Sequence, residues 1–210
     1  MISATLLIVG SISLILFALI GFIVLKSDMP WIDHFWINVM ESIQWTPLHW
    51  VMRIFTLFGD ILFLSILVLA CMLYFIKYNK KKHVIALGMI YAGYIFVNQV
   101  FKRIIDRERP HVERIVEVTG SSFPSGHTMG AFAIYGTLLV FVLASKKMQP
   151  VQKWLIPLLA SLPFAVALSR NYLGAHYMTD VLGAAFLSIT VICYTLALPI
   201  FKKKKSQSPE

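Results

Sequence analysis

Charged residues are scarce in this chain. Only 14% of its 210 residues carry a charged side chain, whereas 58% are hydrophobic, and the mean hydropathy is +0.75. A soluble domain of this size rarely has so little charge, so the composition predicts an integral membrane protein. Long unbroken apolar runs, rather than the short alternating segments of a β-barrel, favour an all-α bundle that forms a single domain over residues 1–210.

Cysteine is nearly absent, and acidic residues are few. Cys71 and Cys193 both lie within apolar runs, which predicts small buried side chains rather than a disulfide or a metal site. Ten acidic residues against 19 basic ones leave a net charge of +9. Such a charge could suit nucleic acid, but the lysines form short clusters beside hydrophobic runs, as the positive-inside rule describes. We therefore expect the lipid bilayer, and no nucleic acid, as a partner.

Six apolar runs are candidates for membrane spans, each of which needs about 20 residues. They cover 2–25, 54–76, 84–101, 128–144, 154–168 and 181–200. The first is too long for a signal-peptide core and no basic residue precedes it, so we expect it to be retained. The stretch 26–53 holds four of the five tryptophans and places Trp31, Phe35 and Trp36 on one helical stripe. This predicts an amphipathic helix in the headgroup layer, either an anchor or a gate that steers a lipid toward the site.

The basic residues separate by type between the two faces that six spans create. Both termini then lie on one face, together with eleven lysines that follow the second span, the fourth span and the sixth span. All six arginines lie on the opposite face with Lys26 and Lys102. The lysine-rich face is expected in the cytoplasm of a multi-pass plasma membrane protein. Because guanidinium groups bind phosphate in a bidentate manner, the arginines predict an anion site on the outer face.

Two segments of that outer face contain cations or free amides. Lys102 and Arg109 share one side of the third helix if that helix continues through residue 108, and Pro110 would place Arg109 at the helix end. Ser125 and Gly126 stand at the expected start of the fourth span, with Ser125 as the capping residue. The unpaired amides of a helix N-terminus attract phosphate.

The remaining candidate residues carry acid–base and nucleophilic chemistry. His127 follows the capping segment and suits a proton carrier. His176 and Asp180 are spaced i, i+4, so the carboxylate can accept a hydrogen bond from one ring nitrogen and leave the other free to attack. Arg170 adds a third cation to this group. Asp60 lies near the outer end of the second span, where a charge must be paired or wet, so we expect a contact with the arginines, Arg103 or Arg107 being the candidates.

Three motifs carry a resemblance to a known family. Lys102-x6-Arg109-Pro110, Pro124-Ser125-Gly126-His127 and Ser169-Arg170-x5-His176-x3-Asp180 resemble, in order and spacing, the three signatures of the type 2 phosphatidic acid phosphatase family. The resemblance implies a six-span fold. The chain length and the short loop between the first two motifs are most similar to the bacterial branch, which includes phosphatidylglycerophosphate and undecaprenyl-diphosphate phosphatases. Vanadium haloperoxidases share the motifs but are soluble, and six apolar spans count against them.

The resemblance also implies a role for each residue. His176 would attack phosphorus and become a phosphohistidine, Asp180 would orient its ring, and His127 would protonate the leaving oxygen and later activate water. The phosphate would be bound by Lys102, Arg109, Ser125, Gly126 and Arg170. No metal or other cofactor is expected, and the loop acids Asp106, Glu108, Glu113 and Glu117 are expected to be solvated rather than to recruit Mg²⁺.

The expected substrate is a lipid phosphate monoester or diphosphate that reaches the site from the outer leaflet. Phosphatidylglycerophosphate, undecaprenyl diphosphate, phosphatidic acid and diacylglycerol diphosphate all remain open, because the shape of the groove between helices would select the lipid tail. The alternative is a non-catalytic protein that binds or transports lipid headgroups. Transport predicts polar or broken helices at mid-membrane, whereas the ionisable residues here gather at one edge.

Overall fold

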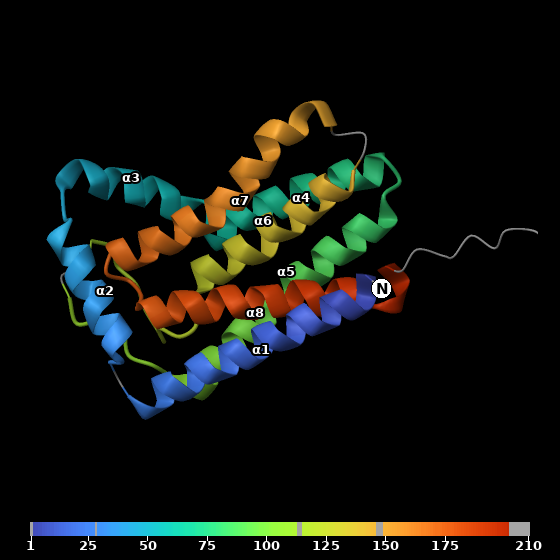
Figure 1. The fold of residues 1–210 in the computed structure, drawn as a ribbon. Coiled ribbons are helices and arrows are strands. Elements are labelled where there is room, and N and C mark those ends of the chain that lie inside the picture. Colours follow the sequence, from blue (N-terminus) through green and yellow to red (C-terminus); the bar gives the residue numbers. More distant parts are fainter. Residues whose placement is uncertain (1, 28, 113–114, 146–148, 202–210) are drawn as a thin grey trace, which may run out of the picture.

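The computed structural model describes residues 2–27, 29–112, 115–145 and 149–201, and all regular structure in these ranges is helical. The helices are α1 (Ile2–Lys26), α2 (Trp31–Ser42), α3 (Thr46–Leu57), α4 (Ile61–Lys77), α5 (Lys81–Ile105), α6 (Gly126–Ala144), α7 (Gln149–Tyr172) and α8 (Met178–Ala197), followed by a 3₁₀ turn at Pro199–Phe201 (Figure 1). The all-α fold predicted from the sequence is confirmed.

Within the described residues, five helices are each long and apolar enough to cross a membrane, namely α1, α5, α6, α7 and α8. A sixth span exists if α3 and α4, which meet at an angle of 45°, are counted as one broken span. The second span predicted over 54–76 is therefore not one straight helix, but two helices that meet at a bend. The break falls at Gly59 and Asp60, where the Asp60 carboxylate accepts the Leu62 N–H at 2.8 Å and caps the start of α4.

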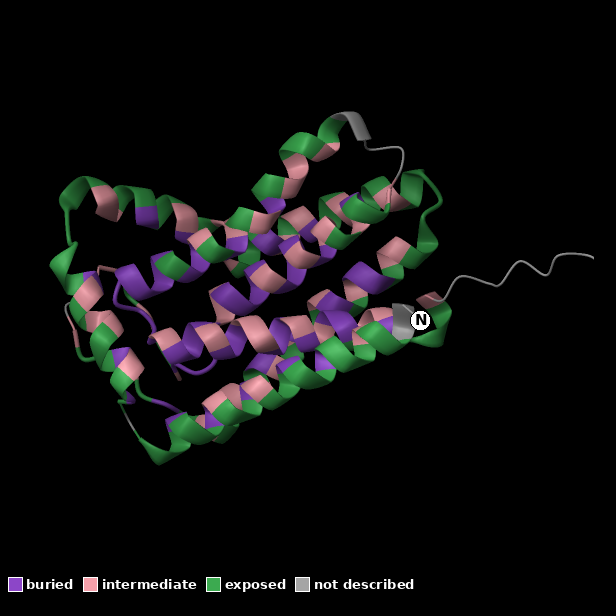
Figure 2. Ribbon diagram, in the orientation of Figure 1, coloured by how far each residue is buried: buried purple, intermediate pink, exposed green. Residues whose placement is uncertain are grey.

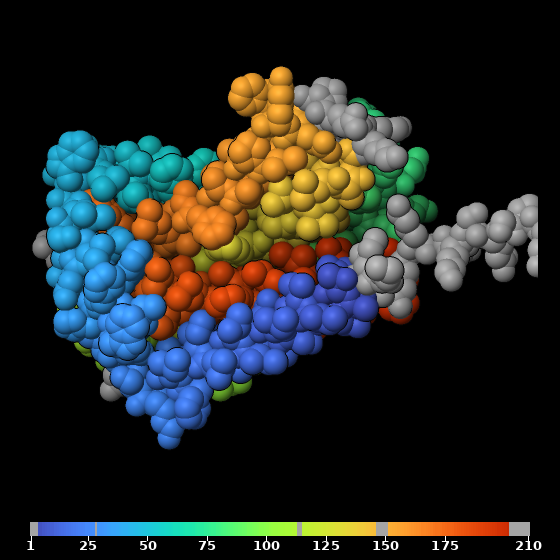
Figure 3. Space-filling model, in the orientation of Figure 1, coloured from blue at the N-terminus to red at the C-terminus, as the bar shows by residue number. Residues whose placement is uncertain are grey.

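The amphipathic helix predicted after the first span is α2. It runs across one end of the bundle, whereas most of the other helices run lengthwise (Figure 1). The segment 26–53 is not a single helix, because a turn at 43–45 separates α2 from α3. Trp31 is 79% exposed, while Asp33 and Met40 are buried on the side that faces the bundle. Figure 3 shows that α2 and the start of α3 cover this end of the molecule.

Helix α6 forms the centre of the bundle and packs against α4, α5, α7 and α8. Its side chains Met129, Ala131, Ala133 and Ile134 have no exposed surface. In contrast, α1 presents many exposed apolar side chains on its outer face, as expected for a helix that contacts lipid (Figure 2). Gly130 allows close packing here, since a Cβ atom on it would lie 2.6 Å from Leu64 Cδ1.

The two ends of the bundle differ in their chemistry. The start of α1, the α4–α5 turn and the end of α8 lie at one end (Figure 1), and Lys77, Lys80, Lys81 and Lys82 lie in or next to that turn. The opposite end holds α2, the loop residues 106–112 and 115–125, and the turn between α7 and α8. The lysines at 146, 147 and 202–205 lie outside the described residues. All three sequence motifs therefore meet at the end that is covered by α2.

Candidate active site

A cavity of about 310 Å³ opens at this end of the bundle. Its lining includes Lys102 from α5, Arg109 from the following loop, Gly126 and His127 from α6, Arg170 from α7 and His176 from the α7–α8 turn. Asp180 and Ser125 are completely buried and do not line the cavity. The structure thus brings both imidazoles and three cations to one cavity, although the three motifs are far apart in the chain.

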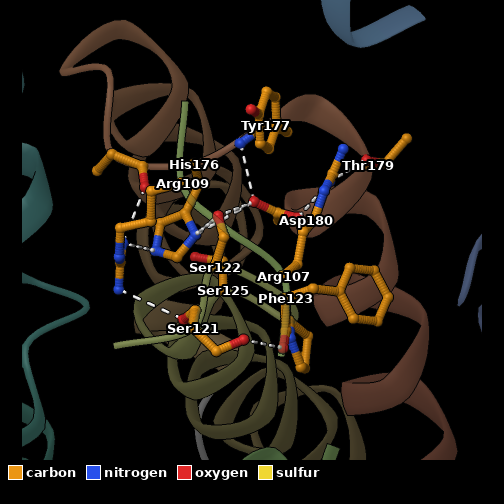
Figure 4. Close-up of polar contacts among 12 residues, drawn as sticks. Arg107, Arg109, Ser121, Ser122, Phe123, Ser125, His176, Tyr177, Thr179 and Asp180 are labelled. Atoms are coloured by element: carbon orange, nitrogen blue, oxygen red, sulfur yellow. Dashed lines mark hydrogen bonds and ion pairs between the residues drawn. The ribbon is translucent and has the colours of Figure 1, made fainter. Parts of the chain in front are cut away.

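His176 is oriented through both of its ring nitrogens (Figure 4). Its Nε2 lies 3.3 Å from Nη1 of Arg109, and since a guanidinium group can only donate, Nε2 is the acceptor in this contact. The proton therefore resides on Nδ1, which lies 3.5 Å from the Asp180 carboxylate and 3.4 Å from the Ser122 hydroxyl. This arrangement leaves a nitrogen lone pair on the side of the ring that faces the guanidinium group.

The ionisation of His176 follows from its surroundings. Its side chain is almost fully buried, and this burial lowers its pKa to about 4 against the opposing effect of the Asp180 carboxylate. Nearby Arg170 and Arg109 lower the pKa further. The imidazole is therefore neutral at pH 7, which is the form in which nitrogen acts as a nucleophile.

Asp180 is held rigidly behind the imidazole. It is the third residue of α8, and its Oδ2 accepts the backbone N–H of Tyr177 at 2.9 Å and a short hydrogen bond from the Ser122 hydroxyl. Its Oδ1 accepts a bond from Arg107 at 2.6 Å (Figure 4). The i, i+4 spacing of His176 and Asp180 does bring them together, but His176 precedes α8 instead of belonging to it.

Arg109 reaches the cavity by a route different from the one expected. Helix α5 ends at Ile105, because Asp106 adopts a left-handed conformation with φ 39° and its N–H closes the last turn on the Lys102 carbonyl. The helix does not continue through 108, so Lys102 and Arg109 do not share a helical face. Arg109 is instead fixed by donating to the carbonyls of Thr119 and Gly120, both at 2.9 Å, and of Ala175 at 2.8 Å.

The other two cations are held by neutral oxygens. Lys102 donates a short hydrogen bond to the Ser121 carbonyl, and Arg170 donates to the Thr56 hydroxyl at 2.6 Å. Because carbonyl and hydroxyl groups fix a cation without neutralising it, the cavity keeps a positive potential. The Nε of Arg170 is buried without a hydrogen-bond partner among the described residues, which leaves one strong donor unsatisfied.

The start of α6 agrees with the sequence in position but not in bonding. Ser125 is the N-cap with an extended backbone, yet its hydroxyl makes no capping bond to the helix amides and instead accepts from the Thr128 hydroxyl at 3.1 Å. The amides that the sequence assigned to Ser125 are thus not capped by its side chain. His127, in the first turn, places Nε2 4.0 Å from an Asp60 carboxylate oxygen. Asp60 thus approaches His127, rather than the expected Arg103 or Arg107.

Several residues of the site were not assigned to it from the sequence. Arg107 and Thr179 contact each other and lie next to Asp180, and Asp33 of α2 contacts both of them. Asn98 lines the cavity and donates to the Pro124 carbonyl at 3.2 Å, which holds the loop before α6. Arg107 lies within the arginine-rich loop, and this was the one available signal for it. The sequence holds no such signal for Asp33, because its hydrogen-bond partners are more than 70 residues away.

Fold and site together define a multi-span membrane protein with a cavity lined by cations and two histidines at one end of its helical bundle. Residues 82–204 match the model of the PAP2 superfamily. The match covers more than half of the chain, and the chain belongs to this family, as the three motifs indicated.

Curated relatives match over about half of their own length. Phosphatidylglycerophosphatase B of Bacillus subtilis is 31% identical over 113 residues, which are 53% of this chain and 56% of that protein. Undecaprenyl-diphosphatase BcrC of the same organism is 27% identical over 118 residues, which are 54% of this chain and 56% of that protein.

Two solved structures share the fold. A transmembrane PAP2 type phosphatidylglycerolphosphate phosphatase from Bacillus subtilis superposes with a TM-score of 0.83 at 23% identity, covering 93% of this chain and 98% of the other. LpxE of Aquifex aeolicus superposes with a TM-score of 0.63 at 20% identity, covering 76% and 92%. These likenesses confirm a membrane-protein fold of several apolar helices.

Proposed function

We propose that this protein is a lipid phosphatase that hydrolyses a phosphate monoester or diphosphate of a lipid through a phosphohistidine at His176. One observation carries the proposal: Nε2 of His176 is unprotonated and accepts from the Arg109 guanidinium within a cavity that His127 also lines. Membership of the PAP2 superfamily and the names of the curated relatives support the same reaction class.

In the first step, Nε2 of His176 attacks phosphorus and the bond from phosphorus to the leaving oxygen breaks. His127 donates its proton to that oxygen, so a lipid alcohol, or a lipid monophosphate from a diphosphate, departs. In the second step, His127 takes a proton from water, the water oxygen attacks phosphorus, and the P–N bond breaks to release phosphate. Each acid–base role of this kind contributes typically about 10²–10⁴ in rate.

The cations of the cavity would stabilise charge on the three equatorial oxygens of the transferring group. Lys102, Arg109 and Arg170 line the cavity, and the start of α6 at Gly126, which the Ser125 side chain does not cap, adds the positive end of a helix dipole. The unsatisfied Nε–H of Arg170 is a donor that a phosphate oxygen would satisfy. Asp180 would stabilise the imidazolium formed when His176 carries phosphate.

The proposed reaction needs no metal ion, because fixed cations supply the charge that Mg²⁺ provides in other phosphoryl transfers. The described residues contain no group of three or more His, Cys, Asp or Glu side chains arranged to hold a metal. The cavity is proposed to face the outside of the cell, since Lys77, Lys80, Lys81 and Lys82 lie at the other end. The exposed tryptophans of α2 and α3 would then lie in the outer headgroup layer.

The decisive experiment compares His176→Ala with His111→Ala in purified protein. His111 is exposed and pairs only loosely with Glu108, so its variant should behave like the wild type. We expect His176→Ala to release no phosphate from a short-chain lipid phosphate while binding of the lipid largely survives. The wild type is also labelled with a lipid that carries a radioactive phosphate, and the reaction is quenched in acid or in base. A protein-bound label that survives base but not acid, and that His176→Ala lacks, would identify the phosphohistidine. Phosphate release from His176→Ala at the wild-type rate would disprove the proposal.

The competing function is a non-catalytic protein that binds or transports lipid headgroups with the same arginines. It predicts binding of lipid phosphates without any phosphate release, even at high protein concentration. If release is found, turnover of phosphatidylglycerophosphate, undecaprenyl diphosphate, phosphatidic acid and diacylglycerol diphosphate by the same preparation identifies the preferred substrate. The curated relatives make the first two the leading candidates.

A further inference from the structure

Asp33 is a carboxylate with no exposed surface on α2, a helix in which Met40 is the other buried residue. Burial of an isolated charge is very costly, so its partners show what it does. Its Oδ1 accepts the backbone N–H of Thr179 at 2.9 Å, and its Oδ2 accepts the Thr179 hydroxyl and Nη2 of Arg107, both at 2.7 Å. Asp33 therefore ties α2 to the first turn of α8.

Arg107 joins this carboxylate to the one behind the proposed nucleophile. Its Nη2 donates to Asp33, while its Nη1 donates to Asp180 at 2.6 Å and to the Thr179 hydroxyl at 2.7 Å. The guanidinium carbon also lies 3.9 Å from the centre of the Tyr177 ring. Burial alone would lower the pKa of Arg107, but the Asp180 and Asp33 carboxylates raise it above its ordinary value, so it stays cationic.

The net charge of Asp33, Arg107 and Asp180 decides how strongly Asp180 stabilises a positive charge on the His176 imidazole. Asp33, Arg107 and Asp180 together carry a net charge of about −1 when both acids are ionised. Without Asp33, Arg107 would pair with Asp180 alone and the pair would be neutral. An imidazolium on His176 would then lose much of its electrostatic support.

We propose that Asp33 and Arg107 are positioning residues that set the orientation and the effective charge of Asp180, and thereby the reactivity of His176. The proposal rests on the phosphatase function proposed above. It also gives α2 a defined part in the reaction, because the helix that lies across the cavity end supplies the balancing carboxylate. Neither residue lines the cavity, so both act through Asp180 and not by touching the substrate.

Other charged and titratable groups that surround His176 must stay constant in any test of this idea. They are Asp180 on α8, Arg109 in the loop, Arg170 on α7, Lys102 on α5, His127 on α6 and Asp60 at the start of α4. Substitutions at Asp33 and Arg107 leave all of these side chains in place. They change the charge behind Asp180 and the hydrogen bonds that Asp33 and Arg107 make to Thr179 and Asp180.

The test measures kcat, KM and the acid limb of kcat/KM for Asp33→Asn, Arg107→Gln and the double variant in full-length protein, with a short-chain lipid phosphate as substrate. Asp33→Asn should lower kcat about tenfold, with KM nearly unchanged, and move the acid limb down by about one pH unit. Arg107→Gln should move the limb upward, since two unpaired carboxylates favour the imidazolium. The double variant restores the net charge of about −1, so its limb should return to the wild-type position and its kcat should exceed that of Asp33→Asn.

Glu41→Gln is the matched control, because Glu41 lies on the same helix, is exposed, and should leave every parameter unchanged. Limbs that stay within about 0.3 pH unit of the wild type, or that move in the same direction in both single variants, overturn the proposal. So does a double variant that is slower than Asp33→Asn, since a purely structural role predicts additive damage. Should one single variant fail to fold, the other two still test the proposal, because the remaining single variant should have a shifted acid limb and the double variant an unshifted one. Failure of the phosphatase function is distinguishable, because wild-type protein would then release no phosphate.

Discussion

Nη1 of Arg109 lies 3.3 Å from Nε2 of His176, so the nitrogen proposed to attack phosphorus already faces a cation suited to the same phosphate. The contact defines the tautomer of the ring, since Arg109 cannot accept a hydrogen bond. The remaining donors of Arg109 are bound to carbonyl oxygens of the loop and of Ala175. A bound phosphate oxygen would compete with Nε2 of His176 for the Nη1–H of Arg109. Its binding would therefore also free the Nε2 lone pair for attack on phosphorus. Nucleophile and phosphate-binding cation are therefore coupled, and replacing one alters the other.

This coupling gives the first prediction, for Arg109→Lys. Lysine keeps the charge but lacks the planar fork, so it cannot bond both the loop carbonyls and Nε2. We expect kcat/KM for a lipid phosphate to fall by about 10²-fold or more, which is the typical loss when one charge-stabilising donor is removed. Arg53→Lys is the control, because Arg53 is exposed and does not line the cavity; it donates to the Ile115 carbonyl at 2.7 Å and lies 5.4 Å from the centre of the Trp50 ring. Equal activities of Arg109→Lys and wild type would show that charge alone suffices.

The second prediction concerns pH. His176 must be neutral to attack, and burial lowers its pKa to about 4, so kcat/KM should hold from neutral pH to about pH 5 and fall tenfold per pH unit below pH 4. The ionisation of the substrate phosphate is measured separately and divided out. An acid limb centred near pH 6.5, the ordinary value for histidine, would mean that His176 is solvated and not held as described.

The same depressed pKa has a consequence for stability. An unfolded His176 would bind a proton near pH 6.5, whereas the folded protein resists protonation down to about pH 4. The unfolded chain thus binds more protons in this window, and the contribution of His176 to the free energy of unfolding should decline as the pH falls from 6.5 to 4. Thermal unfolding in detergent at several pH values measures the decline. His176→Gln should flatten it, while an unchanged slope in that variant would assign the decline to other groups.

The third prediction distinguishes the role of His127 from that of His176 by comparing substrates with different leaving groups. His127→Ala should slow hydrolysis of a lipid phosphate by about 10²–10⁴, because the departing alkoxide needs a proton. An aryl phosphate leaves as a stable phenolate, so its first step should be affected far less. Water activation in the second step still requires His127, and the variant should therefore show a burst of phenolate followed by slow turnover, with label retained on His176. Equal losses for both substrates without a burst would exclude the acid–base role.

Much of the site could be predicted from the sequence, because its parts are local. Lys102, Arg109, Gly126, His127 and Arg170 stand in short motifs whose residue types already suit phosphate, and helices that span a membrane carry their ends to one of two faces. All five line the cavity. What local periodicity could not show is contact between distant segments.

Asp33 illustrates the limit. Its hydrogen-bond partner Thr179 is 146 positions away, so no spacing rule connects the two, and α2 looked like a simple interfacial helix. The break of the second span at Gly59 was also missed. An apolar run of 23 residues indicates a continuous helix, whereas the bend depends on how closely Gly59 approaches α6 and α7.

The same close approach gives the fourth prediction, for Gly59→Ala. A Cβ atom on Gly59 would lie 2.5 Å from Val166 Cγ1 and 2.9 Å from the backbone oxygen of His127, and the backbone of α6 cannot move aside cheaply. We expect a loss of about 1–3 kcal/mol in the free energy of unfolding, as in other overpacked sites, together with lower kcat because His127 would be displaced. Thermal unfolding and turnover of the same detergent preparation measure both effects.

Gly21→Ala is the control for this substitution. A Cβ atom on Gly21 would meet only Ile105 Cδ1 at 3.7 Å, an ordinary contact, and alanine favours the helical conformation by about 0.5–1 kcal/mol relative to glycine. Its variant should therefore be as stable as the wild type or slightly more stable, with unchanged turnover. If Gly59→Ala matched Gly21→Ala in both measurements, the α3–α4 break would not press on His127, and the bend would have to be explained by Asp60 capping α4 alone.

The fifth prediction concerns metal ions. Fixed cations from α5, α7 and the loop 106–125 supply positive charge at the cavity, so an excess of a divalent-metal chelator should leave phosphate release unchanged. The competing possibility is that acids of the loop, such as Asp106 and Glu108, recruit Mg²⁺ to the rim. The double variant Asp106→Asn, Glu108→Gln separates the two. If the chelator lowers the activity of the wild type but not that of the double variant, a functional cation is bound at the rim. With chelator-resistant wild-type activity, Arg170→Gln should instead be the damaging change, since it removes a buried cation whose Nε–H has no hydrogen-bond partner among the described residues.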